Sequence, residues 1–349
     1  MVPFVNLKMS KDRSNHLSSF VILLITCFSC FAGADNRREI RDVRIMMGSR
    51  FELTVVAEDE ALAREAIESA YQEIRRLEAL ISSWQEGSQT TEVNRQAGIQ
   101  PVQVNDELFE LTRRALKVSN WTNGAFDITF SSMYNVWNFK GENLSPPDPE
   151  TIKRHLQYVD YQKVKIDPNK KTVFLPEKGM RIGFGAIGKG LAANGAARVL
   201  KEHGFKNGLV DAGGDLMAFG LDVTGQPWRI GIVHPRAEGK LIMELRLTDQ
   251  AIVTSGDYER YFIYEGKRYG HIINPKTGWP VDHLRSVTVI CPDAELADAL
   301  ATAVFVMGAE EGLATVNRLK GIEAIFIDNE NRITVSNGID QHIIKEFEP

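Results

Sequence analysis

The sequence of 349 residues has little cysteine, little net charge and no repeat or low-complexity tract, and these absences narrow the function. Two of the three cysteines, Cys27 and Cys30, lie in an N-terminal apolar segment. Cys291 alone remains in the rest of the chain, which therefore cannot form an internal disulfide. A net charge of −5 argues against non-specific binding to nucleic acid. With 43% apolar and 25% charged residues, the composition is that of a globular protein, folded as one large domain or two packed lobes.

The N-terminal segment has the features of a targeting signal. Its basic start, apolar core and small-residue cleavage site are Lys8, Lys11, Arg13, residues 20–31 and Ala32-Gly33-Ala34. The apolar core is short for a membrane span, and small residues stand three and one positions before a cut at Asp35. We therefore expect residues 1–34 to be a signal peptide and residues 35–349 to work outside the cytoplasm, as a periplasmic protein.

A lipoprotein signal is the alternative for this segment, because Cys27 and Cys30 both lie near the end of the apolar core. Neither cysteine has the usual context, since Thr26 precedes Cys27 and Cys27 itself stands three residues before Cys30. Plain secretion is therefore preferred. A lipid anchor at the inner membrane stays open as the one membrane contact that the sequence allows.

The pattern of apolar residues predicts helices and strands in an irregular order. Residues 40–56 alternate as two strands around Met47-Gly48-Ser49, residues 58–81 have the spacing of an amphipathic helix, and a polar segment follows at 82–98. The other predicted elements are helices at 105–122, 151–156 and 295–306, a hairpin at 164–175, and strands at 228–234, 240–247, 251–254, 261–264, 286–290, 322–327 and 333–336. No regular alternation of strand and helix appears, so we expect an α+β fold with mixed sheets and flanking helices.

The most informative stretch is rich in glycine and spans residues 181–215. The apolar run 180–184 is predicted to be a short strand, and a glycine turn that carries Lys189 follows it. A helix of small residues then begins at Leu191 and ends at Gly204. Free backbone N–H groups and the helix dipole would both point at an anion bound in this turn. We interpret it as a phosphate or pyrophosphate site, and a tight strand–helix connection without a ligand is the alternative.

Two known glycine motifs nearly fit this stretch. Gly183-x-Gly185-x-x-Gly188 with Asp211 is similar to the dinucleotide fingerprint, but such a unit normally opens its domain among alternating strands and helices. Gly183-x-x-x-x-Gly188-Lys189 is similar to a P-loop, but Gly190 stands where a Ser or Thr would bind magnesium. A glycine pattern alone is therefore a weak signal.

Asp298 and Thr302 are candidate ligands for a metal ion. They lie four residues apart on a predicted helix, so a carboxylate and a hydroxyl share one face and could bind Mg²⁺. The alternative is an acid favoured by the helix dipole and a threonine bonded back to its own helix.

His271 and Trp84 are candidates for catalysis and ligand binding. His271 stands at the start of an apolar strand run, and its ring could take a proton from a hydroxyl nucleophile; the alternative is a solvated histidine at a strand edge. Trp84 could cover a ligand ring, although a lone tryptophan is more often packing. Asp257 and Arg260 are spaced for a plain surface ion pair.

Seven short motifs occur in one order along the chain. They are Met47-Gly48-Ser49, Gly124-Ala125-Phe126-Asp127-Ile128-Thr129, Gly185-Ala186-Ile187-Gly188-Lys189-Gly190, Ala212-Gly213-Gly214-Asp215, Thr254-Ser255-Gly256-Asp257, His271-Ile272-Ile273-Asn274-Pro275-x-Thr277-Gly278 and Ala297-Asp298-Ala299-Leu300-x-Thr302-Ala303. In this order they are far more specific than any one of them. From about Met47 to Gly308 the chain resembles the ApbE family, the FAD:protein FMN transferases.

The resemblance implies a two-lobed single unit over residues 35–349 and a Mg²⁺-dependent, extracytoplasmic enzyme. Such an enzyme cleaves the pyrophosphate of FAD, passes FMN to a Thr or Ser hydroxyl of a partner protein through a phosphoester, and releases AMP. The partners in the family are flavin-carrying subunits of membrane redox complexes and related extracytoplasmic flavoproteins.

The resemblance also assigns roles to individual residues. In the family the metal is held by an Asp, a Thr and a backbone carbonyl, which match Asp298, Thr302 and Ala186. The positions that match the flavin site are Met47, Trp84, Ala125, Phe126, Asp127, Lys189 and, less closely, Ile272. The motif histidine, which matches His271, looks like the base for the acceptor hydroxyl.

One departure from the family pattern concerns Gly183, because the family commonly has Asp two residues before the position of Gly185. A carboxylate contact to the flavin nucleotide is therefore missing here. Either water or a neighbouring residue makes that contact instead, or the affinity for FAD is lower. Ser49 stands where Thr is usual and keeps the hydroxyl. Two other functions stay open: a protein that stores or hydrolyses FAD without a protein acceptor, and a dinucleotide-dependent oxidoreductase.

The signal sequence generates the first testable prediction. We expect the protein from its native host to begin near Asp35 and to be found in an extracytoplasmic fraction, because the small residues at 32–34 follow an apolar core. N-terminal sequencing of the fractionated protein measures this. Cytoplasmic protein with an intact Met1 would contradict it, and a diacylglycerol-modified Cys27 or Cys30 would establish the anchored alternative.

Overall fold

The structure is a computed structural model that describes residues 36–142, 144–237 and 239–346. The predicted signal peptide lies outside the described residues. Arg37–Pro349 group as one compact unit. Within the described ranges, no helix combines the length and the apolar character that crossing a membrane needs.

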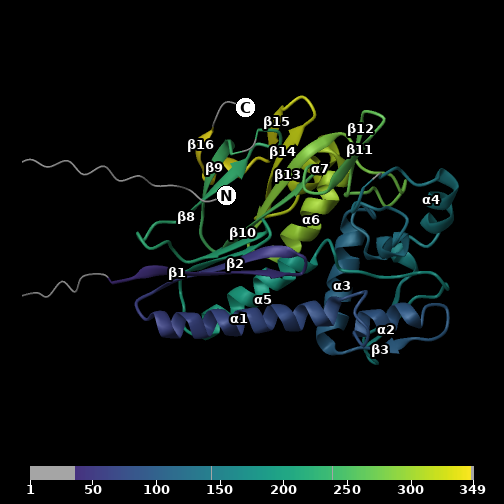
Figure 1. Ribbon diagram of the computed structural model, residues 1–349, viewed down its shortest axis with the longest axis horizontal. Coiled ribbons are helices and arrows are strands. Elements are labelled where there is room, and N and C mark those ends of the chain that lie inside the picture. Colours follow the sequence, from purple (N-terminus) through teal and green to yellow (C-terminus); the bar gives the residue numbers. More distant parts are fainter. Residues whose placement is uncertain (1–35, 143, 238, 347–349) are drawn as a thin grey trace, which may run out of the picture. The chain divides into compact units, whose positions relative to one another are not determined.

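An antiparallel sheet of eight strands forms the centre of this unit (Figure 1). In spatial order its strands are β1 (Arg38–Met46), β2 (Ser49–Ala57), β6 (Gly208–Ala212), β7 (Leu216–Phe219), β10 (Gln250–Gly256), β13 (Leu284–Cys291), β14 (Glu323–Asp328) and β15 (Ile333–Val335). β1 and β2 join through Met47 and Gly48, which both have positive φ, so the predicted hairpin closes in a two-residue turn.

The remaining strands form three small sheets. They are β8 (Trp228–Val233) with β9 (Leu241–Leu247) and β16 (Ile343–Glu346); β3 (Val102–Gln103) with β5 (Thr172–Phe174) and β4 (Lys165–Asp167); and β11 (Tyr261–Tyr264) with β12 (Lys267–Gly270). The helices are α1 (Glu60–Ile81), α2 (Gln89–Arg95), α3 (Asp106–Trp121), α4 (Pro149–Leu156), α5 (Gly188–Glu202), α6 (Ala294–Met307), α7 (Ala309–Val316) and the 3₁₀ helices η1 (Ile128–Met133), η2 (Tyr161–Lys163) and η3 (Ile339–Gln341). This is the α+β fold that the sequence predicts.

Two hydrophobic cores lie on opposite faces of the large sheet. Alternate residues of β13 belong to different cores: Val287 and Val289 pack with the helices, and Ile290 packs with β8 and β9. In Figure 1, α1 and α5 lie on one side of β1 and β2, and β8 and β9 lie on the other. A sheet that is covered on both faces is rigid, and it fixes the positions of the loops that leave its ends.

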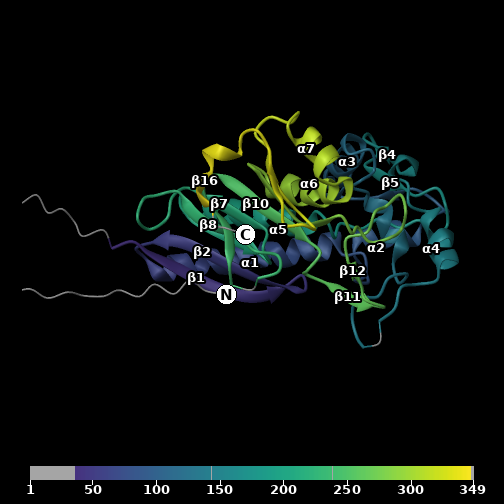
Figure 2. The ribbon, with the colours of Figure 1, turned by 90° about the horizontal axis from the view of Figure 1, so that it is seen from above.

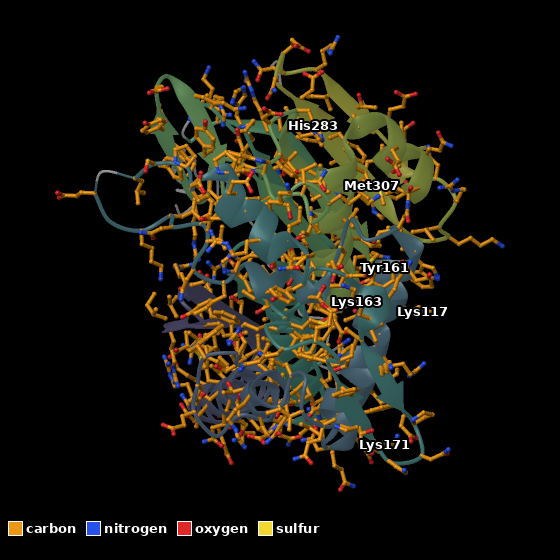
Figure 3. All side chains as sticks on the ribbon, turned by 90° about the vertical axis from the view of Figure 1, so that its right-hand side faces the viewer. Lys117, Tyr161, Lys163, Lys171, His283 and Met307 are labelled. Atoms are coloured by element: carbon orange, nitrogen blue, oxygen red, sulfur yellow. The ribbon has the colours of Figure 1, made fainter. Side chains whose placement is uncertain are left out.

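The smaller elements gather at one end of the large sheet. Figure 2 shows α2, α3 and α4 with the hairpin β11–β12 beyond the ends of β1 and β2. Figure 3 looks at this end, with Tyr161 and Lys163 of η2 near the middle and Lys171 and His283 towards the edges. The loops that meet here come from distant parts of the chain.

The predicted strand at residues 180–184 is wrong, because these residues form no ladder with another strand. Side chains satisfy their backbone groups instead. The Asn94 amide donates to the Ile182 carbonyl at 2.9 Å and accepts from the Ile182 N–H at 2.7 Å. The Ser132 hydroxyl accepts from the Arg181 N–H at 2.8 Å. Hydrophobic pattern cannot predict such side-chain pairing, so the apolar run was interpreted as a strand.

Three smaller predictions also need correction. The polar segment 82–98 contains α2, which is capped by the Ser88 hydroxyl and has a single buried aliphatic residue, Val93, too few for a helical stripe. α5 begins at Gly188 rather than Leu191. His271 lies in a loop and not in a strand run, since the one bridge nearby joins Ile273 to Pro280.

The topology also decides against the dinucleotide fingerprint. No strand leads directly into the glycine turn, since residues 175–187 form none, and β6, which follows α5, pairs antiparallel with β2 and β7. All strand pairs of the described residues are antiparallel. A dinucleotide site of that type needs parallel strands joined by a crossover helix. The glycine turn therefore belongs to a different kind of site.

Candidate functional site

A cavity of about 520 Å³ opens where the loops meet the end of the large sheet. Every residue that the resemblance assigns to metal, flavin or catalysis lines it: Met47, Trp84, Ala125, Phe126, Asp127, Ala186, Lys189, His271, Ile272, Asp298 and Thr302. They come from the β1–β2 turn, the loop after α1, the loop before η1, the glycine turn, the loop after β12 and α6. The fold thus brings all the predicted site residues together, while what each one binds remains a prediction.

The glycine turn ends in the N-terminus of α5, and no side chain of the N-cap residue Ile187 caps it. The backbone N–H of Gly190 donates to Asp298 Oδ2 at 3.0 Å. A Cβ on residue 190 would lie 2.0 Å from the Ala294 carbonyl oxygen, so only glycine lets α5 approach α6 this closely. The glycine turn therefore leads into a helix N-terminus as predicted, and one of the N–H donors there already binds a carboxylate of the protein.

Lys189 and Asp215 form a buried ion pair beside this helix end. Lys189 Nζ lies 2.9 Å from Asp215 Oδ2. The Asp215 side chain is 1% exposed, and its Oδ1 has no hydrogen-bond partner in the described part of the chain. Sequence analysis placed Asp215 in a motif without giving it a role. The unpaired buried oxygen marks it as part of the site, because such atoms are costly unless something binds them.

Charge is unbalanced around Lys189. Burial disfavours its ammonium, but the nearby carboxylates of Asp215, Asp298 and Glu259 outweigh burial and raise the pKa of Lys189. Burial raises the pKa of Asp215 well above its ordinary value, and the charge of Asp298 adds to this. Burial likewise raises the pKa of Asp298, against the opposing effect of Lys189. The three carboxylates of Asp215, Asp298 and Glu259 outnumber the two cations Lys189 and Arg260, so the cluster has room for additional positive charge.

Asp298 and Thr302 face the cavity from α6, and the alternative explanations for them do not hold. Asp298 lies in the second turn of α6, beyond the first-turn positions that the helix dipole favours most. The Thr302 hydroxyl makes no hydrogen bond to a described residue, so it does not bond back to its helix. In the residues described, no group of three or more His, Cys, Asp or Glu side chains is arranged for a metal. One carboxylate, one free hydroxyl and the carbonyl of Ala186 are nevertheless the hard oxygen ligands that Mg²⁺ accepts alongside water.

His271 is held by its backbone while its ring stays unbonded. Its N–H donates to the Arg260 carbonyl at 3.0 Å. The ring atom Nδ1 is buried without a hydrogen-bond partner in the described ranges. Burial, and secondarily the nearby charge of Arg260, lower the pKa of His271 to about 4. The solvated-edge alternative is wrong: the ring is largely buried and is neutral at physiological pH.

Asp127 builds the wall of the cavity. Its Oδ1 accepts from the Thr129 N–H at 2.7 Å and the Thr129 hydroxyl at 2.6 Å, and its Oδ2 accepts from the Tyr161 N–H at 3.0 Å. Burial raises the pKa of Asp127, and these three hydrogen bonds oppose that shift. The carboxylate thus fixes the position of Ala125 and Phe126, both buried against the cavity.

Trp84 is 71% exposed at the edge of the cavity, so it is not a packing residue. Met47 reaches the cavity from the β1–β2 turn, and Ile272 is buried in the wall beside His271. These side chains give the cavity an apolar part that suits a flat ring system.

Asp257 forms a different ion pair from the one predicted. Its carboxylate pairs with both terminal nitrogens of the Arg236 guanidinium, which comes from the β8–β9 loop, rather than with Arg260. Arg260 and its neighbour Glu259 line the cavity instead. Arg236 and Asp257 are 21 positions apart in sequence and lie on different elements, so spacing along one element cannot pair them.

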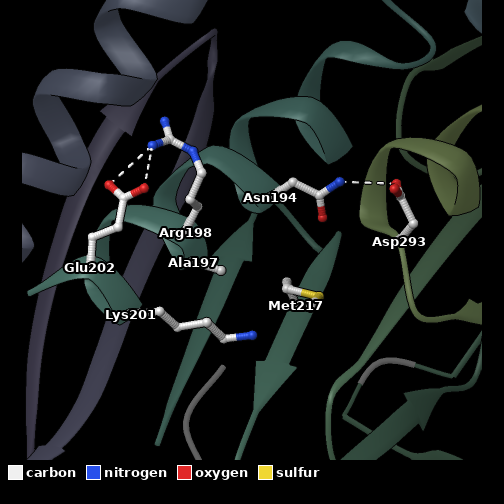
Figure 4. A pocket seen from close by; sticks show the side chains of 7 residues that line it. All are labelled: Asn194, Ala197, Arg198, Lys201, Glu202, Met217 and Asp293. Carbon is white, nitrogen blue, oxygen red and sulfur yellow. Dashed lines mark hydrogen bonds and ion pairs between the residues drawn. The ribbon is translucent and has the colours of Figure 1, made fainter. Parts of the chain in front are cut away.

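A second hollow on the outer side of α5 contains none of the predicted site residues (Figure 4). Its arginine is already paired, since Arg198 binds Glu202 at 2.9 Å and Glu73 at 2.7 Å. Asn194 donates to Asp293, the N-cap of α6, at 2.9 Å. These contacts join α5 to its neighbours and leave no free group for chemistry.

Comparisons with known proteins agree with this geometry. A model of the ApbE family matches residues 47–326. A FAD:protein FMN transferase of Treponema pallidum is 32% identical over 336 residues, which is 90% of this chain and 93% of that protein. One from Klebsiella pneumoniae is 34% identical over 295 residues, which is 84% of this chain and 90% of that protein. The crystal structure of an ApbE protein from Thermotoga maritima has a TM-score of 0.79 at 31% identity and covers 89% of this chain and 100% of its own. The apo flavinyl transferase ApbE of Pseudomonas stutzeri has a TM-score of 0.76 at 28% identity and covers 89% of this chain and 98% of its own.

Proposed function

The chain belongs to the ApbE family, and from this premise we propose that it is an FAD:protein FMN transferase that depends on Mg²⁺. One observation supports the proposal most: a single cavity joins an apolar, aromatic part to a charged part that contains a helix N-terminus, a lysine and a neutral histidine. FAD has the same division, with a flat ring system joined to a pyrophosphate.

The charged part of the cavity would hold the pyrophosphate. Lys189 lies in the glycine turn beside the N-terminus of α5, where the ammonium and the helix dipole both favour an anion. When phosphate oxygens arrive, Lys189 can contact them while it stays within reach of Asp215. Phosphoryl transfer depends mainly on such positioning and on stabilisation of charge.

Mg²⁺ would be held by Asp298, Thr302 and the Ala186 carbonyl. The free hydroxyl of Thr302 and the shortage of positive charge around Lys189 fit this ion. When bound, Mg²⁺ would neutralise the pyrophosphate and stabilise AMP as it leaves.

His271 would act as the base towards the acceptor. In the proposed reaction, the hydroxyl oxygen of a Thr or Ser attacks the phosphorus on the FMN side, the bond from that phosphorus to the oxygen of AMP breaks, and His271 takes the hydroxyl proton. A ring with a pKa of about 4 is a weak base, but it is already unprotonated when the hydroxyl arrives. The cations Arg260 and Lys189 contribute to this low pKa, and the negative charge of a bound pyrophosphate would offset their effect.

We further propose an acceptor outside the cytoplasm, either the flavin-carrying subunit of a membrane redox complex or a related extracytoplasmic flavoprotein. Hydrolysis of FAD to FMN and AMP is the alternative reaction, because the same site could use water instead of a protein hydroxyl. An oxidoreductase that binds a dinucleotide at the glycine turn is disfavoured by the antiparallel sheet.

Intact mass tests the proposed function directly. With FAD, Mg²⁺ and a candidate acceptor flavoprotein, we expect the acceptor to gain the mass of FMN less one water and AMP to appear in equal amount. An acceptor whose reactive Thr or Ser is changed to Ala is the control and should gain nothing. AMP with no change in any acceptor would favour hydrolysis, and neither product from FAD would contradict the proposal.

The metal site predicts the effect of Asp298→Asn, which keeps the shape and an oxygen acceptor for the Gly190 N–H but loses the charge. Loss of groups around a metal typically costs about 10–100-fold in affinity. We therefore expect Asp298→Asn to need at least roughly 100-fold more Mg²⁺ for AMP release. Thr302→Val should need less additional Mg²⁺, because it removes a neutral ligand, and Thr302→Ser is the matched control. The measurement is AMP release against Mg²⁺ concentration, and an unchanged curve for Asp298→Asn would remove it from the metal site.

His271→Asn separates chemistry from binding. FAD should still bind, while FMN transfer should fall by roughly 10²–10⁴-fold because no base remains. The base is active when neutral, so kcat/KM for FAD should lose this contribution only as pH falls through about 4, and the pH profile of kcat/KM, which reports the free enzyme, measures this. Lack of FAD binding by His271→Asn would make His271 a binding or structural residue. Transfer at the wild-type rate would show that it is not the base.

A further inference from the structure

Gly183 has no side chain, and the side chain of Ser131 occupies the space beside its backbone. A Cβ on residue 183 would lie 2.8 Å from Ser131 Oγ, 3.0 Å from Ser131 Cβ and 3.6 Å from Ser83 Oγ. All three residues line the cavity. The side chain of Ser131 therefore occupies the volume that a side chain at 183 would need, with the Ser83 hydroxyl close by.

Both hydroxyls are free to bind a ligand. Within the described part of the chain, neither Ser131 Oγ nor Ser83 Oγ makes a hydrogen bond, although the carbonyls of both residues do. The next residue, Ser132, differs, because its hydroxyl is used internally on the backbone of Arg181. A hydroxyl can donate one hydrogen bond and accept two, so this pair offers several bonds to whatever enters the cavity.

The hydroxyls are also held in place. The Gly183 N–H donates to the Ile128 carbonyl at 3.0 Å, which joins the bare backbone to the 3₁₀ helix that carries Ser131. The Arg181 guanidinium donates to the Ser83 carbonyl at 2.9 Å, which joins the same segment to the loop after α1. One backbone hydrogen bond and one from the Arg181 side chain thus join the three segments, so the backbone positions of Ser83 and Ser131 are set before a ligand binds.

The neighbours of the hydroxyls indicate the kind of ligand. Ser83 adjoins the exposed Trp84, and Ser131 adjoins Phe130, which also lines the cavity. An aromatic face beside fixed hydroxyls suits a flat ring that carries polar atoms on its edge. The charged cluster around Lys189 is made by other residues, so this part of the cavity is suited to the ring and not to the phosphates.

We propose that Ser131, with Ser83, hydrogen-bonds a polar edge of the flavin ring and sets the affinity of this chain for flavin nucleotides. The inference rests on the proposed function, since it names contacts within the same cavity.

Binding to three probes tests this assignment with the full-length protein. We expect Ser131→Ala and Ser83→Ala each to weaken binding of FAD and of FMN by roughly three- to tenfold, the typical effect of one neutral hydrogen bond. Binding of ADP, which has no flavin, should not change. Ser69→Ala is the matched control, because Ser69 is exposed on α1 and bonds its own helix.

A compensating pair tests whether residues 131 and 183 share one volume. Gly183→Asp alone should weaken FAD binding, because its Cβ would collide with Ser131. Gly183→Asp combined with Ser131→Gly should bind FAD at least tenfold more tightly than Gly183→Asp alone, and thermal unfolding should show that both variants are folded. Independent, additive effects of the two changes would overturn the shared volume.

The outcomes distinguish this inference from the proposed function. A wild-type protein that binds no FAD would defeat the proposed function itself. A wild-type protein that binds FAD and transfers FMN, with serine variants that bind FAD and FMN as tightly as the wild type, would overturn the inference alone. Equal weakening for FAD, FMN and ADP would also overturn it, because the loss would then reflect general damage to the cavity.

Discussion

The site depends on the close approach of α5 to α6. Gly190 has no side chain, and no larger residue fits at this position, because a Cβ there would lie 2.0 Å from the Ala294 carbonyl oxygen. This approach brings the first turn of α5, with Lys189, against Asp298 in the second turn of α6. The two helices belong to segments about a hundred residues apart, and the large sheet packs against both. The helix contact thus positions Lys189 and Asp298, while loops supply the other residues that line the cavity.

This contact concentrates charge in a buried place. Asp215 and Asp298 are buried and Lys189 is half-buried, and burial shifts the pKa of both carboxylates upward. A protein tolerates such a cluster when a ligand completes its charge balance, as a divalent cation with a pyrophosphate would do. Burial also lowers the pKa of His271, and the nearby charges of Arg260 and Lys189 add to this shift. Burial therefore shifts the pKa values of all these groups, and the proposed ligands would balance the charge of the cluster.

The sequence predicted the parts of the fold that follow from local pattern. Residues 58–81 and 105–122 have a clear helical stripe, and the turn at Met47-Gly48 requires positive φ, so these elements were predicted within a few residues. The sequence motifs also contain residues that line one cavity in the structure. The strand at 180–184 was wrong because side chains of Asn94 and Ser132 bond its backbone, and α2 was missed because it has almost no apolar stripe. The partnership of Asp257 with Arg236 and the roles of Asp215 and Ser131 depend on tertiary contacts that no spacing reveals.

The two cores on opposite faces of one sheet limit how this protein can change over generations. In β13, and likewise in β10 and β14, neighbouring residues serve different cores. One apolar residue can replace another there at moderate cost, but the insertion or deletion of a single residue would turn every later side chain of the strand to the opposite face. The loops that line the cavity are not limited in this way, because their residues do not alternate between the two cores. The lineage of this chain can therefore alter its specificity through changes in loop length, whereas its central strands must keep a constant number of residues.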